Sequence, residues 1–195
     1  MLTAQKGVGD AMVAAFIQWG PVMGLNGPRY AHRAEATIIL PTGDYDRRNA
    51  VNPGSNFWSF SPYWAGTYWF SPKWTASTRL HYLWNAKNDD SSAFGPRVTS
   101  IRAGQAVYAN FATEYAVTPE LKLGVNGYWL RQTTDTQANG ADVPGRREGV
   151  WAIGPGLLYN FSQHNVVVVN AFFEHDARNR PEGSRFQVRW IHHFH

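Results

Sequence analysis

Long runs in which apolar and polar side chains alternate are the feature of this sequence that most constrains its fold. In the run nearest the C-terminus the two faces carry different side chains: Phe186, Val188, Trp190, His192 and Phe194 on one, and Arg185, Gln187, Arg189 and His193 on the other. Successive side chains of a β-strand point to opposite faces. A period of two therefore predicts a strand with one apolar and one polar face.

These runs are longer than the strands of soluble proteins. The alternation recurs over residues 29–40, 73–85, 106–117, 121–132, 148–161 and 165–175. Each run covers about 11 to 14 residues, whereas soluble strands usually have about 5 or 6 and a tilted membrane strand needs about 9 to 11. The length of the runs favours strands that cross a membrane.

The connections between the runs alternate in length. Short turns are expected at residues 71–73, 118–120 and 162–164, and long polar loops at 41–56, 86–99, 133–147 and 176–183. Bacterial outer-membrane barrels have short periplasmic turns, longer external loops and aromatic girdles at both interfaces. The sequence therefore predicts an all-β fold, an antiparallel up-and-down transmembrane β-barrel, with the long loops outside the cell.

Composition fits this fold without requiring it. Aromatic residues make up 15% of the chain and charged residues 16%, against about 25% charged residues in an average soluble domain. The mean hydropathy is -0.39, and no run approaches the ~18 apolar residues of a transmembrane helix. A soluble, aromatic-rich β-sandwich that binds carbohydrate remains as an alternative.

The number of strands bears on how the domain is organised. Nine strands are readable, from residues 8–19 to residues 185–194, but single-chain bacterial barrels have even strand numbers. The start of the sequence lacks the basic and apolar regions of an export signal. We therefore expect residues 1–195 to form one outer-membrane barrel domain that lacks N-terminal strands and the signal peptide. The alternative is a further strand hidden in a loop.

Several motifs resemble those of a known family. The most specific lie at residues 52–56 (Asn-Pro-Gly-Ser-Asn) and 180–183 (Arg-Pro-Glu-Gly). Further matching stretches lie at residues 7–10, 40–45, 57–58, 62–67, 80–85, 126–129, 153–156 and 179. With these motifs the chain resembles the meta-pathway phenol-degradation proteins, a family of outer-membrane channels found in Pseudomonas-like bacteria.

The resemblance carries expectations about function and partners. It implies a monomeric barrel of about twelve strands in the bacterial outer membrane. Such a barrel contacts outer-membrane lipid and lipopolysaccharide, and the barrel assembly machinery inserts it. It would let small solutes diffuse through, among them aromatic or anionic compounds linked to aromatic degradation.

Polar side chains of the inward faces are predicted to line the pore. They are Arg33, Glu35, Arg79, His81, Arg102, Asn110, Glu114, Lys122, Asn126, Glu174, Arg185 and Arg189. Six of them are cationic and three are carboxylates. Charged side chains in a pore select ions by sign, so we expect a weak preference for anions.

The last strand carries a second predicted site. Many outer-membrane barrels end in an aromatic residue on an alternating strand, which the assembly machinery reads. We predict this assembly signal at Phe186, Val188, Trp190 and Phe194.

Other classes of function find little support in the sequence. There is no cysteine, and His192 and His193 point to opposite faces of one strand, so neither a metal site nor a cofactor is expected. The arginines are scattered singly and do not form the basic face of a nucleic-acid-binding protein. An outer-membrane barrel enzyme acting on lipid remains an alternative, although the Gly-x-Ser-x-Gly motif is absent. We expect the chain not to be an enzyme.

Overall fold

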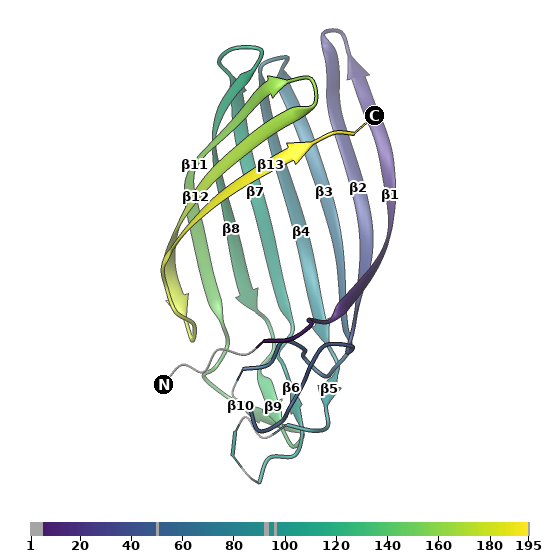
Figure 1. The fold of residues 1–195 in the computed structure, drawn as a ribbon, viewed down its shortest axis with the longest axis vertical. Helices are drawn as coiled ribbons and strands as arrows, with labels where there is room; N and C mark the ends of the chain where they lie inside the picture. The colour runs from purple at the N-terminus through teal and green to yellow at the C-terminus, as the bar shows by residue number, and fades with distance from the viewer. Residues whose placement is uncertain (1–5, 50, 92–93, 96, 195) are drawn as a thin grey trace.

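The computed structural model describes residues 6–49, 51–91, 94–95 and 97–194, and one curved antiparallel sheet dominates it (Figure 1). Within these residues the sheet has nine strands, each hydrogen-bonded to its neighbours along the chain. They are β1 (Ala11–Gly24), β2 (Gly27–Leu40), β3 (Ser59–Ser71), β4 (Trp74–Asn85), β7 (Ala106–Ala116), β8 (Leu121–Gln132), β11 (Gly149–Ser162), β12 (Asn165–Arg178) and β13 (Ser184–His192). The nine strands predicted from the sequence are thus confirmed, with shifted ends.

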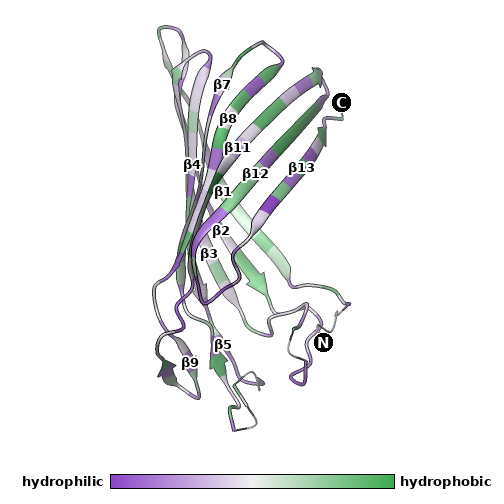
Figure 2. Ribbon diagram, turned by 90° about the vertical axis from the view of Figure 1, so that its left-hand side faces the viewer, coloured by the Kyte–Doolittle hydropathy of each residue, from purple (hydrophilic) through white to green (hydrophobic). Residues whose placement is uncertain are grey.

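The sheet curls into a trough whose two edges are β1 and β13. Figure 2 shows the curvature from the side, with polar and apolar residues alternating along β13. Among the described residues β1 pairs only with β2, and β13 pairs only with β12. Because β1 and β13 are the first and the ninth of nine antiparallel strands, they run in the same direction (Figure 1).

Short turns gather at one end of the trough and long loops at the other (Figure 1). The long loops contain four short strands, which form a second antiparallel sheet in the order β10-β9-β6-β5. They are β5 (Lys87–Asn88), β6 (Ile101–Arg102), β9 (Thr136–Ala138) and β10 (Ala141–Val143). Strands therefore do lie hidden in the loops, but they pair with one another and none extends the nine-stranded sheet.

The outward face of the sheet is apolar and uncovered by the described residues. Cross-strand partners such as Trp64 and Leu80, or Trp129 and Trp151, share this face, and these four side chains are 38–49% exposed. No large side chain among the described residues is fully buried. A soluble β-sandwich would cover such a face with a second sheet, so the arrangement favours contact with lipid. The described part of the chain has no helix suited to crossing a membrane.

A proline interrupts the ladder between β11 and β12, and a side chain repairs the gap. Pro155 lies opposite Ala171 in the register that the neighbouring pairs define, and proline has no N–H to donate. The side-chain amide of Asn126, on β8, donates instead to the Ala171 carbonyl over 3.1 Å. This hydrogen bond passes over Gly154, where a Cβ atom would lie 2.3 Å from the Ala171 carbonyl oxygen. The glycine therefore makes room for the repair.

We expect Asn126→Ala to lower the free energy of unfolding by about 1–3 kcal/mol, because the buried Ala171 carbonyl loses its donor. In a Pro155→Ala background the restored N–H can donate to Ala171, so the loss should be smaller. Urea unfolding of the detergent-solubilised protein, followed by tryptophan fluorescence, measures the effect of Asn126→Ala on the free energy of unfolding in both backgrounds. Asn110→Ala, an exposed inward asparagine on β7, is the matched control. Equal losses of stability in the two backgrounds would contradict the claim that Asn126 replaces the missing N–H of Pro155.

Three of the family motifs meet at the loop end of β1. Asp10 accepts hydrogen bonds from the backbone N–H groups of Gly43, over 2.9 Å, and Ser55, over 2.8 Å, and from the Ser55 hydroxyl. Asp44 in turn accepts the Val8 N–H over 2.8 Å. Motifs far apart in the sequence therefore form one polar clamp that joins the segment before β1 to the β2–β3 loop.

The stability of this clamp should depend on pH. Burial alone would raise the pKa of Asp10, but hydrogen bonds from Ser55 and from the Gly43 and Thr42 backbone outweigh it and lower the pKa below 3.8. The stabilisation is thus present above pH 3.8 and is lost as pH falls through the folded-state pKa. We expect Asp10→Asn to destabilise the protein near neutral pH, with a difference from wild type that shrinks in acid. A difference that stays constant in urea unfolding down to acidic pH would contradict this.

Candidate functional site

Most of the predicted pore-lining residues share the concave face of the sheet. The cross-strand register links Arg33 to Ala65 and then to Arg79 and Asn110, which fixes the inward positions of four neighbouring strands. Eleven of the predicted residues lie at such positions: Arg33, Glu35, Arg79, His81, Asn110, Glu114, Lys122, Asn126, Glu174, Arg185 and Arg189. Arg102 lies instead on β6, in the loop sheet, where its Nε donates to the Asn85 carbonyl over 3.2 Å.

One polar cluster lies on β2 and β3. Glu35 is ion-paired with Arg33 and accepts a hydrogen bond from the Tyr63 hydroxyl over 2.7 Å. The Arg33 guanidinium also lies 3.7 Å from the centroid of the Phe16 ring on β1, and its Nε has no hydrogen-bond partner among the residues that the structure describes. Two opposite charges and two rings therefore hold one another in place on the inner face.

A row of aromatic rings continues this cluster across β4 and β7. The His81 ring lies 4.8 Å from Tyr63 and stacks on Tyr108 at 4.2 Å. The guanidinium of Arg79 lies 4.7 Å from the Tyr63 ring centroid. Ring-to-ring contacts of this kind fix side chains that would otherwise be mobile in a water-filled space.

A second cluster lies near the loop end of β8, β12 and β13. Glu174 accepts a hydrogen bond from the Tyr128 hydroxyl and another from the Gly183 N–H over 3.0 Å. Arg180, from the β12–β13 loop, reaches to 3.6 Å from the same carboxylate. Arg185 lies 5.0 Å from the Tyr128 ring centroid. Glu174 thus ties an external loop to the inner face.

The third cluster lies toward the short turns. Lys122 on β8 donates to Glu114 on β7 over 3.0 Å, and Thr75 on β4 donates to the same carboxylate over 3.2 Å. Each inward carboxylate described above is therefore paired with a cation.

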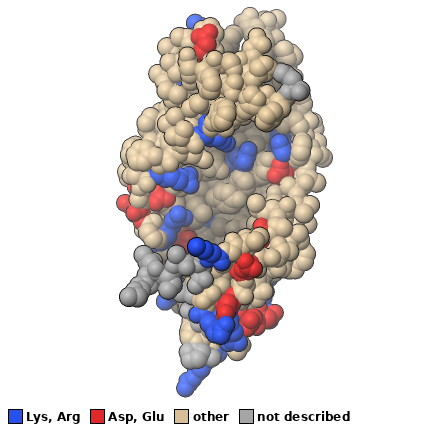
Figure 3. Space-filling model, in the orientation of Figure 1, with Lys and Arg blue, Asp and Glu red and all other residues tan. Residues whose placement is uncertain are grey.

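Three of the predicted inward arginines have no carboxylate partner among the described residues: Arg79, Arg185 and Arg189. The space-filling view shows cationic and anionic side chains around a hollow in the concave face (Figure 3). With the carboxylates paired, these three guanidinium groups leave the hollow with an excess of positive charge.

Two cavities that share one lining residue give the hollow its dimensions. The central cavity, of about 620 Å³, is bordered by Arg33, Arg79 and Arg189. The cavity nearer the loops, of about 430 Å³, is bordered by Arg180 and Arg185. Asn110 lines both cavities. One cavity thus lies toward the loop end and the other in the middle of the trough, and they meet at Asn110.

Sequence reasoning missed several residues of these clusters: Phe16, Tyr63, Tyr108, Tyr128 and Arg180. The aromatic side chains were missed because hydropathy places rings on the lipid face. The period-two phase of each strand would have placed Tyr63 and Tyr108 inward. Only the loop conformation brings Arg180 to Glu174, so periodicity carries no signal for it.

The predicted assembly residues occupy the outward face of β13 and the segment beyond it. Phe186, Val188 and Trp190 are 66–73% exposed, and Phe194, beyond the end of the strand, is 88% exposed. Their recognition by assembly machinery stays a prediction. No group of three histidine or acidic side chains in the described ranges could share a metal ion.

A curved antiparallel sheet with an uncovered apolar outer face and a charged inner face defines the wall of a membrane-spanning β-barrel. The chain belongs to the family described as "Putative MetA-pathway of phenol degradation", whose model matches residues 2–190. This confirms the predicted family.

A solved structure shares the fold. An outer membrane channel from Pseudomonas putida matches with a TM-score of 0.82 at 20% sequence identity, over 96% of this chain and 67% of the channel. This likeness confirms the predicted β-barrel fold. No curated protein matches the sequence.

Proposed function

We propose that the protein is a bacterial outer-membrane channel through which small solutes diffuse. The main observation behind the proposal is the distribution of polar and apolar side chains over the sheet. The concave face is charged and hollow and the convex face is apolar, which is the reverse of a soluble protein. A charged interior and an apolar exterior are what a barrel with water inside and lipid outside needs. The solved relative is itself described as an outer membrane channel, which supports this location and this role.

Small aromatic compounds are the solutes that we propose. The family description refers to phenol degradation, and the central cavity of about 620 Å³ is large enough for a single aromatic ring with its substituents. Arginine beside aromatic rings, as at Arg185 with Tyr128 and Phe172, suits anionic aromatic solutes in particular. The role proposed is passage, with no chemical step.

We further propose that additional N-terminal strands complete the wall as a monomer. β1 and β13 run in the same direction, so an antiparallel barrel needs an odd number of strands between them. Three strands, as the resemblance implies, would make about twelve in all, an even number. Every residue of β1 is exposed, which supports the proposal that a further strand pairs with its free edge.

The arginine excess predicts the sign of the ion preference. In a planar bilayer with a salt gradient, the complete protein should show a reversal potential on the anion-selective side. Replacing Arg79, Arg185 and Arg189 together by glutamine removes the unpaired positive charges, so the reversal potential should move toward the cation-selective side. The ion pairs that fix the three inward carboxylates are left intact by these changes.

Arg131→Gln with Arg178→Gln is the control, since both arginines share the outward face of the wall. It should leave the reversal potential as in wild type. Clear cation preference of the wild-type protein would contradict the proposed selectivity, and the absence of conductance by the complete, folded protein would contradict the channel itself.

A further inference from the structure

A further hollow lies at the loop end of the wall, and outward-facing side chains border most of it. Its volume is about 670 Å³, and Arg131, Arg147 and Arg178 border it together with the outward tryptophans Trp129 and Trp151. The pore proposed above uses none of these side chains. The hollow therefore needs an explanation of its own.

Two of the arginines flank a glycine on one face of the wall. Arg131 on β8 pairs with Gly149 on β11, which pairs in turn with Arg178 on β12. Neighbouring strands are ~4.8 Å apart, so the backbones of the two arginines are about 10 Å apart. A Cβ on Gly149 would meet only the Leu130 carbonyl, at 3.7 Å. The glycine leaves open space between two cationic side chains.

Neither Arg131 nor Arg178 has a carboxylate partner among the described residues. Two acids also border the hollow, Glu148 and Asp176, and Asp176 accepts the Trp151 indole N–H over 3.0 Å. Two guanidinium groups therefore remain available to an anion. Guanidinium groups bind phosphate through paired hydrogen bonds.

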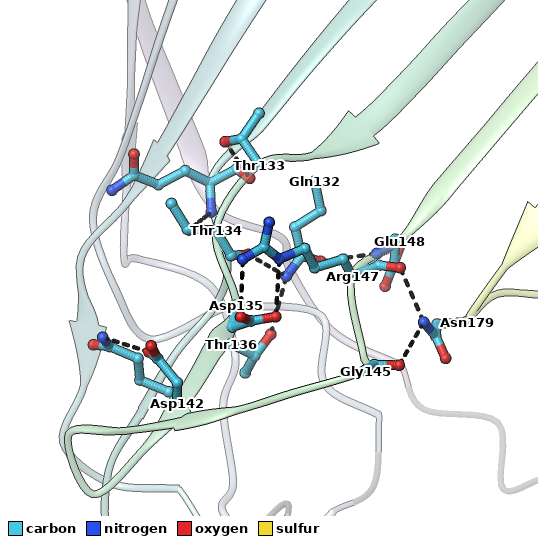
Figure 4. Close-up of polar contacts among 12 residues, drawn as sticks. Gln132, Thr133, Thr134, Asp135, Thr136, Asp142, Gly145, Arg147, Glu148 and Asn179 are labelled. Carbon is cyan, nitrogen blue, oxygen red and sulfur yellow. Dashed lines mark hydrogen bonds and ion pairs between the residues drawn. The ribbon is translucent and has the colours of Figure 1, made fainter.

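The third arginine is held in place by the β8–β11 loop. Arg147 makes two hydrogen bonds of 2.9 Å to the Asp135 carboxylate. Asn179 donates to the carbonyls of Gly145 and Arg147, over 3.0 and 2.9 Å (Figure 4). The loop is thereby tied to the end of β12, and it forms a fixed rim above the hollow.

The position of the hollow relative to the apolar belt identifies the kind of anion. Arg131 lies two residues beyond Trp129 on the same face of β8, about 7 Å further along the strand. Outward apolar side chains continue from there toward the short turns, including Val125 and Ile153, which are 42% and 39% exposed. Aromatic girdles mark the level of the lipid headgroups. The arginines thus lie where a headgroup would be, with acyl chains below.

This charge is confined to one part of the rim. At the loop ends of the other described strands of the wall the outward side chains are uncharged, among them Leu40, Phe60, Trp84, Val107 and Ser184. The cationic rim therefore spans β8 to β12 only, which is typical of a specific site and not of a uniform basic collar.

We propose that Arg131, Gly149 and Arg178 form a binding site for a phosphorylated glycolipid of the outer leaflet, with a lipid A phosphate between the two guanidinium groups and acyl chains against Trp129 and Trp151. The proposal rests on the outer-membrane location proposed above. The site lies at the loop end of β8, β11 and β12, which is the external side of the wall.

Native mass spectrometry of the complete protein in detergent can measure binding of bisphosphorylated lipid A, dephosphorylated lipid A and inorganic phosphate. The variant R131Q/R178Q should bind lipid A about tenfold or more weakly than wild type, since hydrogen bonds to a charged group are lost. The control R97Q/R146Q, which removes two exposed loop arginines, should bind lipid A as wild type does. Wild type should prefer the phosphorylated lipid to both other probes.

Wild-type affinity of R131Q/R178Q for lipid A would overturn the site, as would an equal loss in R97Q/R146Q. Equal binding of phosphorylated and dephosphorylated lipid A would overturn the role of the arginines, and phosphate displacing lipid A at equal concentration would overturn the choice of a lipid. Conductance in the same preparation separates this result from the proposed function. Lipid A binding without conductance would refute the channel and leave the site standing.

Discussion

Backbone hydrogen bonding between strands is the constraint on which the rest of this structure depends. A chain that crosses lipid must satisfy every N–H and C=O group within the protein, and an antiparallel ladder does so with a side-chain period of two. The same ladder that satisfies the backbone therefore sorts the side chains. Polar residues such as Arg79 fall on the concave face, and apolar residues such as Leu80 fall on the convex face.

Places where the ladder is interrupted or ends show how strongly the constraint acts. Pro155 removes one donor, and Asn126 supplies another from the next strand but one. The register shift at the start of β11 and the end of β12 places Arg178 opposite Gly149 and so creates the cationic rim. Inside the trough, carboxylates are paired with cations, which leaves three arginines to set the sign of the field. Local irregularities thus carry the features that distinguish this wall from a generic barrel.

The sequence predicted the fold well because periodicity and loop length are local properties. All nine strands of the wall were readable, and eleven of the twelve residues predicted to line the pore lie on its concave face. Arg102 was predicted on an inward face, but it lies on a two-residue strand within a long loop, where no periodicity indicates its position. Tyr63 and Tyr108 were overlooked because hydropathy does not separate an inward ring from a girdle ring. The Arg180–Glu174 contact depends on loop conformation, which no local pattern encodes.

Thiol labelling along β4 tests most directly whether the concave face of the sheet is in water and the convex face in lipid. The chain has no cysteine of its own, so each introduced thiol reports on one position. Single cysteines would replace Arg79, Leu80, His81 and Tyr82 in turn, in the complete protein in outer membranes. A charged, membrane-impermeant thiol reagent should label positions 79 and 81 and leave positions 80 and 82 unlabelled. Equal labelling at all four positions, or labelling of 80 and 82 alone, would contradict a wall with water on its concave face and lipid on its convex face.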